Sequence, residues 1–109
     1  MGEYRMVVLT KAVAGQHDEL GRWYDTRHIP DLRRVPGLVA AERYSLRRIG
    51  GPPQSLEWDY MVVYTIEADD PMTVIAECGR RLGTDEMPRS PALDSSLTLT
   101  LVATPEYSA

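Results

Sequence analysis

Apolar and polar residues alternate along four stretches of the chain, and alternation at every second position is typical of β-strands. These stretches are 4–11, 38–48, 58–66 and 95–104. The first is apolar on both faces at its Val-Val-Leu centre, which favours a strand in the middle of a sheet. The third is the most regular, and one of its faces holds Trp58, Tyr60, Val62, Tyr64 and Ile66.

A spacing of three and four residues between apolar positions predicts two helices. In the first, 16–28, this period aims His28 at the same side as Trp23 and Tyr24, toward the sheet. Pro30 disfavours helical geometry at the residue before it, so this helix is expected to end or bend at Ile29.

The second helix is predicted to begin at Asp70-Pro71, where Asp70 caps the first turn and proline fits the first helical position. It is expected to end near Gly83. The order of elements is therefore βαββαβ. This order predicts a ferredoxin-like α+β fold, in which two helices cover one face of a four-stranded antiparallel sheet.

Strands 38–48 and 58–66 are expected to pair through the loop 49–57, which contains Gly50-Gly51-Pro52-Pro53. The second face of the sheet is too apolar to lie comfortably in water. We therefore expect a homodimer that packs sheet against sheet and closes into a barrel-like core. A length of 109 residues, 43% of them hydrophobic, suits a single domain spanning 1–109.

Charge and composition narrow the classes of partner. A net charge of −4 argues against nucleic acid and anionic membranes. No apolar run is long enough to cross a bilayer, and the N-terminus lacks the pattern of a secretory signal. With a single cysteine, Cys78, which we interpret as a packing residue, we expect a cytoplasmic protein.

His28 is the first candidate for chemistry, because an imidazole with an ordinary pKa near 6.5 both gives and takes protons near neutrality. Asp25 and Tyr24 precede it by three and four residues, so either is expected to reach it along a helix. In this hypothesis Asp25 orients the ring. The alternative is that His28 only caps the end of its helix.

Aromatic residues supply candidate substrate contacts, with two placements left open. If the face that carries Trp58, Tyr60 and Tyr64 meets the helices, these rings and Tyr44 line a pocket; if it meets a partner subunit, they are interface residues. Met87 either closes this pocket or lies on the surface. The arginines between 22 and 48 either coat solvated faces or include one that orients an anionic group of the substrate, for which Arg43 is the best candidate.

The motif Trp23-Tyr24-Asp25-x-x-His28-Ile29-Pro30-Asp31-Leu32, followed by Val35-Pro36-Gly37 and Arg43-Tyr44, resembles the EthD-like branch of the dimeric α+β barrel superfamily. The resemblance covers nearly the whole chain. It implies a homodimer with a pocket between sheet and helices in each subunit. The superfamily includes muconolactone isomerases, polyketide monooxygenases and cyclases, fungal dehydratases and haem-handling enzymes.

Together these features predict a cofactor-independent enzyme that acts on a small cyclic or aromatic oxygenated metabolite by proton transfer, as an isomerase, dehydratase or lyase. His28 would move the proton, and Tyr44, Tyr60, Tyr64 or Arg43 would hold the oxyanion. No metal-binding, phosphate-binding or dinucleotide-binding motif occurs, so no metal or cofactor is expected. The alternatives are a non-catalytic dimeric protein that binds a small molecule or haem, and a cofactorless monooxygenase.

Overall fold

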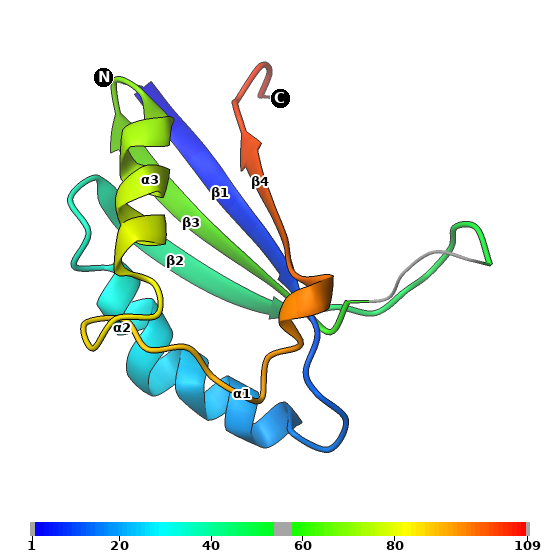
Figure 1. Ribbon diagram of the computed structural model, residues 1–109. Helices are drawn as coiled ribbons and strands as arrows, with labels where there is room; N and C mark the ends of the chain where they lie inside the picture. The colour runs from blue at the N-terminus through cyan, green and yellow to red at the C-terminus, as the bar shows by residue number, and fades with distance from the viewer. Residues whose placement is uncertain (1, 54–57, 109) are drawn as a thin grey trace.

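The chain forms one antiparallel sheet with helices on a single face (Figure 1). The computed structural model describes residues 2–53 and 58–108. The strands lie in the order β2-β3-β1-β4, with β1 inside the sheet as its apolar pattern predicted. The ferredoxin-like fold predicted from the sequence is confirmed. The strand bounds are β1 Gly2–Thr10, β2 Leu38–Ser45, β3 Tyr60–Ala68 and β4 Leu99–Ala103.

All four strands differ from their predicted ranges, β1 and β3 by one or two residues at each end and β2 and β4 by more. β2 ends at Ser45 rather than at 48, and positions 54–57 of the predicted loop lie outside the described residues. The predicted start of the last strand is instead a 3-10 turn, η2 (Ser95–Leu97). Asp94 causes this change, because its Oδ1 accepts a hydrogen bond from Ser96 N at 3.2 Å and stabilises a turn in place of a strand.

The first helix was expected to end or bend at Ile29, and of these two alternatives the structure rules out the end. The helix runs as α1 (His17–Trp23), a π-helical turn η1 (Tyr24–His28) and α2 (Ile29–Leu32). Ile29 itself is helical, and its N–H bonds to the carbonyl of Tyr24, five residues back. This wider turn carries the chain past Pro30, whose ring would meet the carbonyl four residues earlier in a regular α-helix.

The second predicted helix is α3 (Pro71–Arg81). The predicted cap is confirmed, because Asp70 Oδ1 accepts a hydrogen bond from Met72 N at 2.9 Å. α3 turns Val74 and Cys78 toward the sheet, where both are buried. Within the described residues, no helix has the length and apolar character that crossing a membrane requires.

The outer face of the sheet, opposite the helices, is apolar and partly exposed. Leu99 and Leu101 of β4 leave 38% and 47% of their surface in solvent. Their strand partners on this face are Leu9 and Val7 of β1. The homodimer predicted from the sequence would bury this surface, and it stays a prediction.

Candidate functional site

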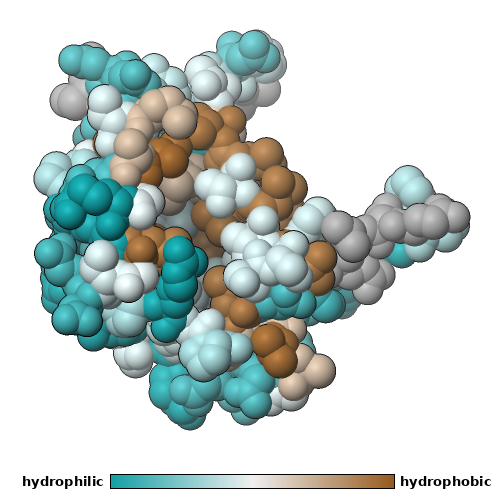
Figure 2. All heavy atoms as spheres, viewed as in Figure 1, coloured by the Kyte–Doolittle hydropathy of each residue, from teal (hydrophilic) through white to brown (hydrophobic). Residues whose placement is uncertain are grey.

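A cavity of about 430 Å³ lies between the inner face of the sheet and the helices. Its walls come from β1, β3, the helix 17–32, α3 and the segment 87–100. The space-filling view shows apolar residues around the hollow (Figure 2). Such a cavity is large enough for a small organic molecule and suits one with an apolar body.

His28 lies in the wall of this cavity. Its ring stacks on Trp23, with centroids 4.2 Å apart and planes 16° from parallel, and it meets Tyr24 edge-on at 5.7 Å. Trp23 and His28 are five residues apart. The α-helical period predicted from the sequence put both on one side, which holds for Tyr24 and His28 but not for residues five apart. The π turn is what brings Trp23 and His28 together. The π turn therefore determines the orientation of the imidazole.

The imidazole of His28 is held neutral. Burial lowers its pKa from 6.5 to about 4, and the nearby Asp31 carboxylate opposes this only in part. Its Nδ1 is buried and has no hydrogen-bond partner in the described structure. At neutral pH the ring is therefore uncharged, because burial disfavours the imidazolium, and it keeps a nitrogen lone pair that can accept a hydrogen bond.

Asp25, which we expected to orient His28, instead binds Arg43. Arg43 Nη2 lies 2.8 Å from Asp25 Oδ1 and 2.9 Å from Oδ2. The guanidinium also lies over the rings of Tyr24 and Tyr60, at 5.8 and 5.6 Å from their centroids. Neither Asp25, Arg43 nor Tyr60 lines the cavity. This ion pair joins the helix to β2, outside the space where a substrate would lie.

Tyr24 and Tyr64, in contrast, line the cavity. The Tyr24 hydroxyl donates a hydrogen bond to Thr10 Oγ1 at 3.2 Å. Burial raises the pKa of both phenols, most strongly that of Tyr64. Both phenols therefore stay protonated, and each has a hydroxyl hydrogen to donate.

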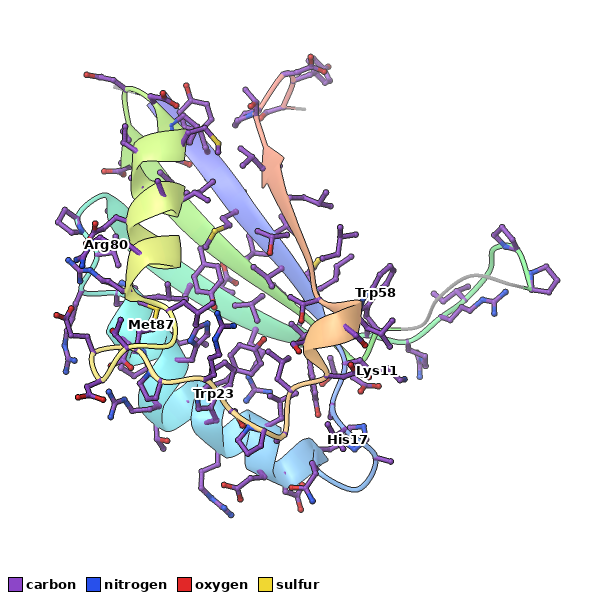
Figure 3. All side chains as sticks on the ribbon, in the orientation of Figure 1. Lys11, His17, Trp23, Trp58, Arg80 and Met87 are labelled. Atoms are coloured by element: carbon purple, nitrogen blue, oxygen red, sulfur yellow. The ribbon has the colours of Figure 1, made fainter. Side chains whose placement is uncertain are left out.

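The other aromatic candidates lie elsewhere. Tyr44 is on the outer face of the sheet, where its hydroxyl donates to Glu42 Oε2 at 2.6 Å. Trp58 lies beside η2, and its Nε1 donates to the carbonyl of Leu97 at 2.6 Å (Figure 3). The sequence had left the face of these residues open. The structure separates Tyr64, which lines the cavity, from Tyr44 and Trp58, which do not.

The segment 84–91 covers one side of the cavity and is fastened to the helix that carries His28. Met87 is almost completely buried and forms part of the cavity wall, close to Trp23 in the side-chain view (Figure 3). Trp23 Nε1 donates to the carbonyl of Pro88 at 3.1 Å. Arg27 Nη2 donates to the carbonyl of Asp85 at 3.0 Å. Of the two placements considered for Met87, the structure shows the buried one.

Sequence reasoning missed several cavity residues, among them Thr10 and Arg89. Cys78 also lines the cavity, but burial raises the pKa of its thiol to about 11, so it is protonated and packs as an apolar group. No signal in the linear pattern joins these positions, because they come from separate elements. Across residues 2–53 and 58–108, no three side chains are grouped as metal ligands.

Asp31 is the buried carboxylate nearest to this site, and only its place in the motif three residues after His28 hinted at a role. It is 4% exposed, and it binds Arg27 Nε at 2.8 Å and Arg34 Nη1 at 3.2 Å. Because Arg27 also holds the segment 84–91, Asp31 fixes the guanidinium that keeps the cavity covered.

Asp31→Asn should lower the free energy of unfolding by about 2 kcal/mol, since a buried carboxylate with two charged donors is lost while both arginines remain partly in solvent. Urea denaturation at pH 7 measures this loss. Asp25→Asn is the matched control, because its pair with Arg43 is more exposed, and we expect less than about 1 kcal/mol. Equal losses in the two variants would show that Asp31 has no special structural role.

No family model matches the chain, and no curated protein matches it. The structure is similar to the crystal structure of an EthD family protein from Bacillus halodurans C-125, with a TM-score of 0.61. The two chains are 16% identical, and the match covers 95% of this chain and 99% of that one. At the level of the fold, this similarity confirms the resemblance to EthD-like proteins predicted from the sequence.

Proposed function

We propose that the chain is a cofactor-independent enzyme of the EthD-like group that transfers a proton on a small cyclic or aromatic oxygenated compound, in an isomerase, dehydratase or lyase reaction. One observation carries the proposal: the partly buried, neutral imidazole of His28 presents a buried, unpartnered Nδ1 in the wall of a mostly apolar cavity. A buried nitrogen without a hydrogen-bond partner lowers the stability of the fold. Its presence in the cavity wall therefore points to a ligand that forms the missing hydrogen bond.

The proposed step begins with His28 as general base. It removes a proton from the carbon next to a carbonyl group, which leaves an enolate and an imidazolium. The Tyr64 hydroxyl, a protonated phenol in the same cavity, donates to the enolate oxygen. Asp31 stabilises the transient imidazolium through its charge. The imidazolium then returns the proton to another atom of the substrate, so the enzyme ends in its starting state.

This assignment narrows the set of catalytic groups expected from the sequence. Tyr44, Tyr60 and Arg43 lie outside the cavity wall, so Tyr64 is the remaining candidate of that set for holding the oxyanion. Trp23 and Met87 shape the walls around the substrate. We further propose that two copies associate through the outer sheet face and that the protein acts in the cytoplasm, as the sequence predicted.

The test is exchange of carbon-bound protons for deuterium in D₂O, followed by proton NMR. A panel of cyclic ketones, unsaturated lactones and hydroxyaryl ketones is incubated with the protein, with heat-denatured protein as the blank. We expect at least one compound to lose the signal of its proton next to the carbonyl faster than in the blank. Binding of panel compounds in the cavity without exchange of any would contradict the proposed reaction.

A second candidate is a non-catalytic protein that binds a small apolar molecule or haem. The position of Asp25 favours it, because the carboxylate expected to activate His28 is engaged by Arg43 on the surface. A neutral imidazole fits the donor chemistry of a haem ligand. Titration with haemin separates the two candidates: a Soret band that shifts in wild type and not in His28→Phe, without proton exchange on the panel, supports binding alone.

A further inference from the structure

Arg89 is the charged group of the cavity wall. Among the described residues that line the cavity, none is an aspartate or a glutamate. The chain as a whole has a net charge of −4, so the wall of the cavity and the rest of the protein have opposite signs. A positive group in a wall that is otherwise uncharged gives the cavity a preference between anionic and neutral molecules.

Arg89 has no protein partner within residues 2–53 and 58–108, although acidic residues are close in sequence at Asp85 and Glu86. The two arginines at the end of α3 are paired, because Arg80 and Arg81 lie 2.6 and 2.7 Å from Glu77 Oε2. When an arginine in a cavity wall forms no ion pair, the N–H groups of its guanidinium are available to donate hydrogen bonds to a ligand.

Gly83 makes room for this guanidinium. A Cβ atom at Gly83 would lie 3.1 Å from Nε of Arg89, and the φ of +87° at this position also favours glycine. The neighbouring Ser90 accepts a hydrogen bond from Ala92 N at 3.1 Å, which leaves the hydrogen of its own hydroxyl free to donate. Two donors that adjoin in sequence therefore lie in the same part of the wall.

We propose that Arg89 binds a carboxylate of the substrate, so that the cavity selects small cyclic or aromatic acids over their neutral analogues. A planar guanidinium matches the two oxygens of a carboxylate. The ring of such a molecule occupies the apolar space beside His28. This inference rests on the proposed function, because it takes the cavity as the substrate site and Arg89 as a specificity-determining residue.

The test is NMR titration of the ¹⁵N-labelled full chain with benzoate and 2-naphthoate, each compared with its primary amide. Because Arg89 is exposed, we expect the wild type to bind each acid about 5-fold more tightly than the amide, with the difference shrinking as salt is added. Arg89→Gln should bind acid and amide equally, with amide affinity as in wild type. Arg89→Lys should keep part of the preference. Arg33→Gln, at an exposed arginine outside the cavity, is the matched control and should behave as wild type.

The result that overturns the inference is a wild type that binds neither acid more tightly than its amide, or an Arg89→Gln variant that keeps the preference. His28→Phe separates this inference from the proposed reaction, since it should keep the preference for acids while losing proton exchange. If the wild type prefers acids over amides but exchanges no proton on any compound, the carboxylate site is supported and the proposed reaction is contradicted. If the wild type exchanges protons but binds acids no more tightly than amides, the proposed reaction is supported and the carboxylate site is contradicted.

Discussion

His28→Phe should lower the rate of proton exchange on a responsive substrate at least about 100-fold, because a positioned general base contributes a factor of about 10² to 10⁴. Phenylalanine keeps a planar ring that stacks on Trp23, so the shape of the cavity wall is retained while Nδ1 is removed. The measurement is the initial rate of deuterium incorporation at neutral pD, with the fold of the variant checked by its thermal unfolding.

Asp25→Asn provides the comparison for this result. Asp25 lies outside the cavity and binds Arg43, so its amide variant should exchange protons at nearly the wild-type rate. An unchanged rate in His28→Phe would remove His28 from the reaction. A loss in Asp25→Asn as large as that in His28→Phe would show that Asp25 acts on the imidazole after all, as the sequence suggested.

The second large effect is on stability at acid pH. Above pH 6.5 the imidazole is neutral in both the folded and the unfolded chain, so it does not affect the balance between them. As the pH falls from 6.5 to about 4, His28 becomes protonated in the unfolded chain but stays neutral in the folded chain. The free energy of unfolding therefore decreases across this pH range. The decrease is about 3 kcal/mol, because each unit by which the pKa is lowered corresponds to about 1.4 kcal/mol.

Urea denaturation at pH 7, 5.5 and 4.5 measures this loss. Carboxylates that pair with arginines also titrate toward low pH, so the informative quantity is the difference between wild type and His28→Phe. The variant should lose markedly less stability than the wild type between pH 7 and pH 4.5. Parallel curves for the two proteins would mean that the imidazole of His28 is not desolvated as described.

The fold was predictable because its signals are local. Alternation along 58–66 gave the strand β3, and Asp70-Pro71 gave the start of α3. Pro30 left the prediction open between an end and a bend at Ile29, because the rule that proline disfavours a helix at the preceding residue assumes an α-helical turn. The same sequence can form a π turn, whose hydrogen bonds join residues five apart. Hydrophobic spacing alone does not distinguish a π turn from an α-helical turn.

The site was predictable only in part, for a geometric reason. Alternation shows that Arg43 and Tyr44 point to opposite faces of β2, but it does not say which face meets the helices. Asp25 was assigned to His28 by helical spacing, yet a long-range partner on β2 holds it. Arg89 and Thr10 meet at one cavity through tertiary packing, which no periodicity in the sequence records.

The π turn has a consequence for how the chain tolerates changes in length. Such a turn holds one residue more than the α-helical turn that it replaces, so it behaves like an inserted position. Removal of Thr26 would let the backbone revert to an uninterrupted α-helix. His28 would then follow Trp23 by four residues, and one α-helical turn would still bring the two rings to the same side of the helix. A homologue shortened by one residue at this point would therefore keep both the architecture and the histidine in the cavity wall.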